Sequence, residues 1–346
     1  MNVTKAAVLF DTNEPLRILL LTIPDLKQGQ VLVRIKYSGI CHTQLGECKG
    51  ERGDDRFLPH CLGHEGSGVV EAVGDGVSKV MAGDKVILSW IRGNGSNGGP
   101  VRYLWNDIPV NAGPITTFQN SAVISEGRVT KIPNTFSLLY AALIGCAIPT
   151  GYGAVINVAQ PRPGMSMAIF GCGGIGLCAL MAAKISGCCP VFAVDTNDEK
   201  LTVAKEMGAD YIINPFKTDS LSMIYQVCPD GPDCSIEATG ITDVMEQALM
   251  CVKNQGGIAT IIGNARFGDR LSFDPRQLNL GKQLRGTWGG DVIPDRDFPR
   301  IIRLIECGLM DPSFLISKIY SLDGINTALD DLENGRVIRP IIDMEQ

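Results

Sequence analysis

Two patterns of hydrophobic and polar positions divide the chain. Up to about residue 140, short β-branched runs are bounded by Gly or Asp, which predicts strands at 31–38, 67–74 and 83–90. From about residue 165, short apolar runs alternate with longer helical patterns. Strand–helix alternation of this kind predicts a parallel, doubly wound α/β sheet in the second region.

The second region can be assigned element by element. Strands are predicted at 166–170 and 191–195, and helices at 174–187 and 197–208. Asn197 is placed to cap the second helix, and Gly208 to end it. Further strands and a helix are predicted up to residue 263, in the order 211–215, 234–240, 243–253 and 256–263. After about residue 290 the pattern predicts one more helix, at 301–308, and a short β-rich tail.

Composition and charge narrow the class of protein. The 346 residues are 45% hydrophobic and 20% charged, which is a globular composition long enough for two domains. With a net charge of −6 and no basic run, we expect no nucleic-acid partner. No apolar run reaches the roughly 18 residues that span a bilayer, so no membrane association is expected. The start lacks a signal-peptide cleavage pattern, and twelve cysteines without a CxxC pair are expected to stay reduced, in the cytoplasm.

A glycine-rich motif follows the strand predicted at 166–170 and opens the next helix. In such a turn the first glycine permits a tight bend, the second lets the backbone approach a pyrophosphate, and the third lets helix and strand pack closely. The free N–H groups at the helix start bind the phosphates. The motif predicts a dinucleotide-binding site at Gly171, Gly173, Gly174, Ile175 and Gly176.

An acidic residue ends the next predicted strand. Asp195 lies where a carboxylate can hold the adenosine ribose hydroxyls, and it would repel the 2′-phosphate of NADP. Lys200 follows within reach of the same ribose. NAD is therefore the expected cofactor.

Three further segments carry residues that bind zinc well. They are GICHTQ around Cys41, LGHEGSG around His64 and GCAIPTGYG around Cys146. The spacing of Cys41 and His64 is too wide for a zinc finger and fits a catalytic site assembled from separate loops. Each residue, taken alone, is also compatible with a buried core cysteine or a surface histidine.

The sequence resembles the zinc-dependent alcohol dehydrogenases of the medium-chain dehydrogenase/reductase family over almost its full length. Within the family, its motifs are most similar to those of the glutathione-dependent formaldehyde dehydrogenase branch. The resemblance rests on Gly-His-Glu followed by Gly68, Gly74 and Val77, and on GCAIPTGYGAVINVA, FGCGGIGL and VDTNDEK. It implies a GroES-like catalytic domain over 1–147, to which 291–346 return, and a Rossmann NAD-binding domain over 148–290. It also implies a homodimer or homotetramer assembled through the Rossmann domain.

The resemblance implies a role for each matching residue. Cys41, His64 and Cys146 would bind one catalytic zinc, with Glu65 close behind as an occasional ligand. Zinc acts there as a Lewis acid on a small-molecule alcohol or its carbonyl product. Thr43 would accept the alcohol proton, while NAD takes the hydride. The remaining family positions near the cofactor correspond to His42, Lys282 and Arg339, of which the last two are also compatible with ordinary solvated charges.

The sequence departs from the family pattern at two places. Gln44 stands where the family usually has an Asp that orients the zinc-bound histidine. The segment 89–105, rich in Gly, Asn and Ser, lacks the four cysteines that bind a structural zinc in many relatives. We therefore expect one zinc per chain, a mobile segment there and a substrate other than S-hydroxymethylglutathione. Trp90 is expected to line the substrate pocket; core packing is the alternative.

Two other functions compete with an NAD- and zinc-dependent alcohol dehydrogenase. One is a zinc-free reductase of the same superfamily acting on quinones or enones, which generally lacks the Cys/His/Cys set. The other is a catalytically inactive NAD-binding scaffold. Its support is Gln44, and Thr43 and Glu65 speak against it.

Overall fold

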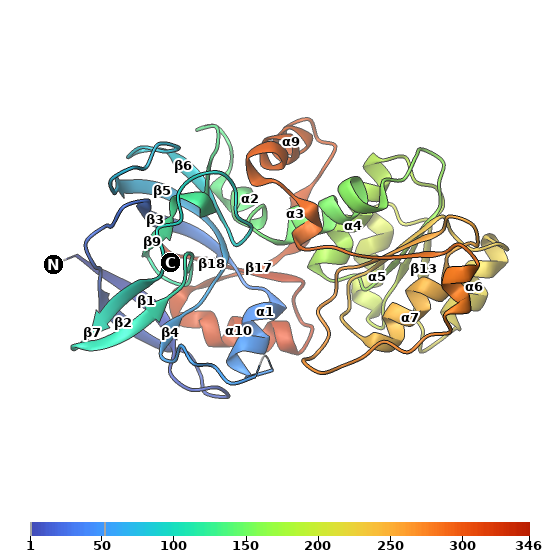
Figure 1. Cartoon of the computed structure of the whole chain (residues 1–346), viewed down its shortest axis with the longest axis horizontal. Coiled ribbons are helices and arrows are strands. Elements are labelled where there is room, and N and C mark those ends of the chain that lie inside the picture. The colour runs from blue at the N-terminus through green and yellow to red at the C-terminus, as the bar shows by residue number, and fades with distance from the viewer. Residues whose placement is uncertain (1, 52) are drawn as a thin grey trace. The chain divides into compact units, whose positions relative to one another are not determined.

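The computed structural model of the chain describes residues 2–51 and 53–346 (Figure 1). These residues form two compact units. The first unit contains the chain up to Cys146 together with Ile293–Arg303 and Leu315–Gln346, and the second contains Ala147–Val292 and Leu304–Phe314. Both ends of the chain therefore contribute to the first unit.

Five strands of the first unit close into a barrel. In order around it they are β1 (Val3–Leu9), β2 (Arg17–Thr22), β7 (Val101–Trp105), β8 (Ile108–Ala112) and β4 (His60–Cys61). Buried residues of these strands, such as Val8, Leu21 and Tyr103, fill its interior. Because Ser89 is the last residue of β6 and β7 occupies 101–105, the loop of the Gly- and Asn-rich segment lies within residues 89–100. Strand β7 was not among the strands predicted from the sequence.

A second sheet of the first unit positions the residues expected to bind metal. Its strands run in the order β10 (Val129–Lys131), β6 (Lys85–Ser89), β5 (Glu65–Val73), β3 (Gln30–Gly39), β18 (Arg339–Asp343) and β17 (Ile316–Ser321), with β9 (Ser121–Ser125) also paired to β3. Strand β18 pairs antiparallel with β3, with Ile341 opposite Gly39. The C-terminal strand therefore brings Arg339 beside the end of β3.

Helices complete the first unit. They are α1 (His42–Cys48), α2 (Leu138–Leu143) and α10 (Ile325–Glu333), and α9 (Pro294–Glu306) begins in this unit. The sequence predicted a β-rich tail without α10. Ile325, Ala328, Leu329 and Leu332 recur at helical spacing and are buried against the core, so α10 is stabilised by tertiary packing of one apolar face.

The second unit is a six-stranded parallel sheet with helices between its strands. Its strand order is β13 (Tyr211–Ile213), β12 (Val191–Val194), β11 (Met167–Phe170), β14 (Cys234–Glu237), β15 (Ile258–Ile261) and β16 (Gln283–Gly286). The helices are α3 (Ala147–Gly153), α4 (Gly174–Ile185), α5 (Asp198–Glu206), α6 (Ser220–Val227), α7 (Thr242–Cys251) and α8 (Arg276–Asn279), with a π-helical segment at Ala154–Ala159. This arrangement confirms the predicted doubly wound α/β fold.

The predicted helix start and stop signals are confirmed around α5. The Asn197 side chain accepts hydrogen bonds from the N–H groups of Glu199 and Lys200, as an N-cap does. Gly208 follows the helix with a φ of 97°, a left-handed conformation that favours glycine.

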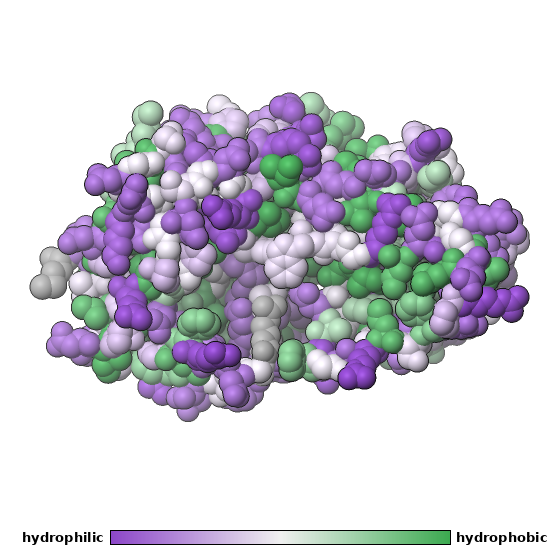
Figure 2. Space-filling view, in the orientation of Figure 1, coloured by the Kyte–Doolittle hydropathy of each residue, from purple (hydrophilic) through white to green (hydrophobic). Residues whose placement is uncertain are grey.

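Short 3₁₀ turns occur at Glu126–Arg128, Gly289–Asp291, Pro312–Leu315 and Leu322–Gly324. The face drawn in Figure 2 carries hydrophilic residues interspersed with smaller hydrophobic areas. Among the described residues, no helix has both the length and the apolar character needed to cross a membrane.

Candidate active site

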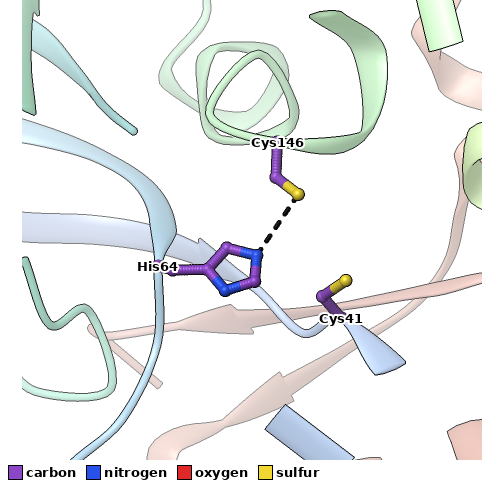
Figure 3. Close-up of side chains that lie close together, drawn as sticks. All are labelled: Cys41, His64 and Cys146. Carbon is purple, nitrogen blue, oxygen red and sulfur yellow. Dashed lines mark hydrogen bonds between the residues drawn. The ribbon is translucent and has the colours of Figure 1, made fainter. Parts of the chain in front are cut away.

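The three predicted metal ligands converge in the first unit. Cys41 follows β3 and caps the start of α1, His64 directly precedes β5, and Cys146 follows α2. Their ligand atoms all lie within 4.8 Å of one another (Figure 3). Within the described ranges, this is the one group of three such side chains close enough to hold a metal ion. Two thiols and an imidazole form a donor set that suits zinc.

Strand pairing and two close backbone approaches explain the convergence. Strands β3 and β5 are antiparallel, with Ser38 opposite Gly66, so the end of β3 lies beside the start of β5. A Cβ atom at Gly145 would lie 2.8 Å from the Cβ of Glu65, and one at Gly39 would lie 2.6 Å from its carboxylate. Glycine at both positions therefore leaves room for Glu65 and lets Cys146 approach the sheet.

The electrostatics of the site favour a metal-binding thiolate at Cys41. A hydrogen bond from Cys146 lowers the pKa of Cys41 well below its usual value, against the effect of burial, and the charge of Arg339 lowers it further. The same hydrogen bond, together with burial, raises the pKa of the donor Cys146. A metal ion takes thiolates as ligands, so one of the two cysteines is already prepared for it.

Each ring nitrogen of His64 has a polar side chain as its partner. Its Nε2 lies 3.2 Å from the Sγ of Cys146, and its Nδ1 lies 2.5 Å from the Nε2 of Gln44. The other end of the Gln44 amide, Oε1, accepts the N–H of Cys41 at 3.1 Å. Burial lowers the pKa of His64, but the hydrogen bond and charge of Cys41 outweigh it, and the pKa is raised overall.

Glu65 and Arg339 form a buried ion pair behind the ligands. The Nη1 of Arg339 lies 3.0 Å from the Oε1 of Glu65 and donates to the carbonyl of Ile40 at 2.9 Å. Burial opposes the charge on Arg339, but Glu65 and the two cysteines raise its pKa above the usual value. The structure therefore places Arg339 in the metal-site cluster. The alternative of an ordinary solvated charge is wrong for this residue, since only 3% of it is exposed.

The remaining site residues of the first unit lie on α1 and after β6. His42, exposed, and Thr43, half-buried, form the first turn of α1 directly after Cys41. Trp90 is half-buried, and its ring meets that of His64 edge-on, with centroids 6.3 Å apart. Trp90 thus lies beside a candidate metal ligand.

In the second unit, the glycine-rich turn has the geometry of a phosphate cradle. Gly171 has a φ of 93°, which permits the tight turn after β11. A Cβ at Gly176 would lie 1.7 Å from the carbonyl oxygen of Gly171, so only glycine allows α4 to pack this closely. A Cβ at Gly173 would meet nothing within 4 Å, so that backbone is open to a ligand. Gly174 and Ile175, both half-buried, form the first turn of α4.

Asp195 lies directly beside this turn. Its Oδ2 accepts the N–H of Cys172 at 2.7 Å, and its Oδ1 accepts the N–H of Asn197 at 2.9 Å. The carboxylate is therefore fixed at the carboxyl edge of the sheet, as a ribose-binding acid must be. Lys200 lies half-buried in the first turn of α5.

The structure contradicts the expectation that Lys282 binds the cofactor. Lys282 precedes β16, so it lies at the amino edge of the parallel sheet, whereas Gly171 and Asp195 lie at the carboxyl edge. Its Nζ donates to the carbonyl of Met250 at 2.6 Å, and only 8% of the residue is exposed. Lys282 is held by the backbone of its own edge of the sheet, away from the glycine-rich turn.

Sequence reasoning missed an anchor of the loop at 89–100. The buried Glu126 carboxylate accepts the N–H groups of Ser96, Ser78 and Lys79 at 2.7, 2.6 and 2.8 Å. Burial opposes the charge, but these bonds lower the pKa of Glu126 to about 2. Asp295 also accepts the N–H of Asn94 at 2.6 Å. An isolated Glu carries no sequence signal for such a role, because its partners are backbone groups distant in the chain.

Comparison with known proteins identifies the family. Residues 27–134 match the model of the alcohol dehydrogenase GroES-like domain, and residues 174–306 match that of the zinc-binding dehydrogenases. The S-(hydroxymethyl)glutathione dehydrogenase of Synechocystis sp. is 33% identical over 98% of this chain and 99% of its own length. The chain belongs to the zinc-binding alcohol dehydrogenase family. The S-(hydroxymethyl)glutathione dehydrogenase of Photobacterium damsela subsp. piscicida, 32% identical at the same coverage, is another member.

Solved structures of alcohol dehydrogenases have the same fold. Benzyl alcohol dehydrogenase from Acinetobacter calcoaceticus superimposes with a TM-score of 0.91 at 28% identity, over 99% of each chain. An alcohol dehydrogenase zinc-binding domain protein from Burkholderia ambifaria gives 0.92 at 30% identity, again over 99% of each chain.

Family membership confirms the resemblance and the GroES-like and Rossmann fold class seen in the sequence. This alcohol dehydrogenase is a zinc- and NAD-dependent oxidoreductase, acting on small-molecule alcohols and their carbonyl products. The comparisons favour neither the zinc-free reductase nor the inactive scaffold.

Proposed function

We propose that Cys41, His64 and Cys146 bind a single zinc ion at which the chemistry occurs. The observation that carries this proposal is the convergence of these three ligand atoms within 4.8 Å. The donor set fits zinc, and three protein ligands leave one coordination position for a substrate, as in other catalytic zinc sites. A thiolate is already favoured at Cys41, so part of the deprotonation that metal binding requires is built into the site.

When bound, zinc supplies Lewis acidity to the substrate oxygen. The residues around the ion hold its ligands in place and transfer protons. Thr43, in the first turn of α1, accepts the proton that leaves the alcohol and passes its own hydroxyl proton on towards solvent. Glu65 and Arg339 form an ion pair behind the ligands, and the positive charge of Arg339 favours the Cys41 thiolate. Glu65, which directly follows His64 in the chain, is proposed as an occasional ligand, and its carboxylate is not one of the three ligand atoms that converge.

The second unit holds NAD. The turn at Gly171, Gly173 and Gly176 receives the pyrophosphate, supported by the open backbone at Gly173 and the start of α4. Asp195 binds the ribose hydroxyls and disfavours NADP, and Lys200 assists it. The other positions proposed to contact the cofactor are His42 and Arg339.

Trp90 and the loop at 89–100 determine which alcohol is accepted. Trp90 stands edge-on to His64, so its indole narrows the space beside the metal. The substrate is a primary or secondary alcohol with a slim reacting end, whose outer part is recognised by this loop. The loop lacks the cysteines of a structural-zinc lobe, which argues against S-(hydroxymethyl)glutathione, the substrate named for several relatives.

A substrate panel tests the proposal. Linear, branched and aromatic alcohols and S-(hydroxymethyl)glutathione are each offered with NAD, and NADH formation is followed by absorbance. Activity with a simple alcohol that is lost in Cys146→Ala is the expected result. Absence of activity with every alcohol, in protein that contains zinc, would rule the proposal out.

The organisation of the protein follows from the same proposal. The GroES-like domain comprises 1–147 and 291–346, and the Rossmann domain 148–290, close to the two compact units. Edge strand β16 and the exposed Trp288 support a homodimer or homotetramer assembled through the Rossmann domain, which light scattering would test. Twelve free cysteines support a cytoplasmic location, which fractionation of cells that produce the protein would test.

A further inference from the structure

The hydrogen bonds around His64 form a chain with a defined direction. The N–H of Cys41 donates to Oε1 of Gln44 at 3.1 Å, which fixes which end of the amide is the oxygen. The Nε2 end of that amide, a donor only, then faces Nδ1 of His64 at 2.5 Å. Nδ1 must therefore accept, and the ring proton lies on Nε2, 3.2 Å from the Sγ of Cys146.

This direction conflicts with metal binding. Nε2 is the nitrogen that faces Cys146 and the rest of the cluster (Figure 3), so it is the nitrogen that would bind zinc. A histidine binds a metal through an unprotonated nitrogen, and its proton then lies on the other one. With zinc bound, Nδ1 of His64 becomes a donor and needs an acceptor, but the group facing it is the NH₂ of Gln44.

A half-turn of the carboxamide removes the conflict. The two ends of the amide have nearly the same size, so the reversal needs no additional space at this fully packed position, where 1% of Gln44 is exposed. The oxygen then accepts from Nδ1 of His64. The NH₂ group then faces the N–H of Cys41, so the start of α1 loses the acceptor that Gln44 gives it.

We propose that Gln44 is a positioning residue whose amide reverses when zinc binds, exchanging its bond with the Cys41 N–H for one with Nδ1 of His64. This inference rests on the proposed zinc site. A carboxylate at position 44 has two acceptor oxygens and would satisfy both partners without reversal. The glutamine therefore makes zinc binding weaker than a carboxylate would, and couples it to the start of α1.

The tautomer of His64 gives a direct test that needs no substitution at Gln44. The chain has three histidines, so spectra of ¹⁵N-histidine-labelled protein are simple, and His42→Asn and His60→Gln variants assign the signals. In alkaline buffer, the zinc-free protein should carry the His64 proton on Nε2, and the zinc-loaded protein on Nδ1. A proton on Nδ1 in the zinc-free protein, in a neutral or a charged ring, would overturn the inference.

Zinc affinity, measured by chelator competition, gives an independent test. Gln44→Glu keeps the length of the side chain and supplies two acceptors. It should bind zinc about 10- to 100-fold more tightly than wild type, the range typical for groups that orient a metal-bound histidine. It should also show the Nδ1 proton with and without zinc. Unchanged or weaker affinity in this variant would contradict the inference.

Gln30→Glu is the matched control. Gln30 is a buried glutamine of the same unit whose amide also bonds at both ends, here to two backbone groups, the N–H of Lys27 and the carbonyl of Gly98. It should lose stability and keep the zinc affinity and the His64 tautomers of wild type. The same titration includes Cys146→Ala. If that variant binds zinc like wild type, the proposed zinc site fails. If it loses zinc, but zinc loading of the wild type does not change the tautomer of His64, only the role of Gln44 fails.

Discussion

Arg339 and Glu65 form an ion pair that is almost completely hidden from solvent, with Nη1 3.0 Å from Oε1 and 4% and 0% of the two side chains exposed. The two residues come from opposite ends of the chain, and strand pairing of β18 and β5 with β3 brings them together. A charge at this depth is tolerated only when it is paired, so each residue depends on the other.

Removing the cation should therefore be costly. Arg339→Met leaves the Glu65 carboxylate buried without this partner, and we expect the free energy of unfolding to fall by about 3–5 kcal/mol in a denaturant titration of the zinc-free protein. Since Arg339 lowers the pKa of Cys41, that pKa should rise in the variant. Alkylation of Cys41 would then begin at higher pH. Wild-type stability together with an unchanged alkylation profile would show that the pair does not have this role.

Zinc content tests the ligand set. Elemental analysis should find one zinc per chain, and Cys146→Ala should lose zinc and activity while its circular dichroism stays the same. Cys61→Ala is the matched control. Cys61 is a buried thiol of the barrel, and burial raises its pKa to about 12, so it stays protonated and should not affect zinc. Two zinc ions per wild-type chain would show that a second site had been missed.

Cofactor choice tests Asp195. Asp195→Asn keeps the shape of the side chain and removes the charge that opposes a 2′-phosphate. The ratio of kcat/KM for NAD to kcat/KM for NADP should fall by roughly tenfold or more. Each tenfold change in this ratio corresponds to about 1.4 kcal/mol. Asp198→Asn removes an exposed carboxylate three residues away that pairs with Lys217, and it should leave the ratio unchanged. Equal use of both cofactors by the wild type would be evidence against our interpretation of Asp195.

The Glu126 anchor predicts a pH dependence. The pKa of Glu126 is about 2 in the folded protein, whereas an ordinary Glu carboxyl has a pKa of 4.5. The stability that Glu126 provides is therefore complete above pH 4.5 and is lost as the pH falls towards 2. The difference corresponds to about 3 kcal/mol. Glu126→Gln should be less stable at neutral pH and should lose less stability over this acidic window. Proteolysis within 89–100 at neutral pH should also be faster. Parallel pH–stability curves for the two proteins would contradict the assignment.

Substrate ranking tests Trp90. Trp90→Ala should enlarge the space beside His64 and raise activity on branched alcohols relative to linear ones, with zinc content and NAD affinity unchanged. Trp105→Ala is the control, because Trp105 packs edge-on against Phe10 with centroids 5.5 Å apart. It should lose stability and keep the wild-type ranking. If Trp90→Ala, like Trp105→Ala, kept the wild-type substrate ranking, Trp90 would be assigned to core packing.

The sequence alone determined the features that depend on local pattern. The alternation after residue 165 specified the parallel sheet, because strands and helices differ in hydrophobic period, and Asn197 and Gly208 marked the ends of α5. The glycine motif could be recognised for the same reason, since the left-handed conformation of Gly171 and the close packing at Gly176 are requirements within one turn. The β-rich character of the first region was also local. The tail was misjudged, because α10 depends on burying one face against distant strands.

Only the tertiary structure decided which side chains meet. Cys41, His64 and Cys146 are far apart in the chain, and the pairing of β3 with β5 together with the close approach of Gly145 to Glu65 brings their ligand atoms within 4.8 Å. Lys282 was misplaced because the strand that follows it, β16, was not predicted from the sequence, so its place at the amino edge of the sheet was not apparent. The direction of the Gln44 amide and the three backbone donors around Glu126 were likewise invisible in the sequence. Hydrogen-bond direction and burial depend on partners from separate strands and loops, and those partners are set by folding.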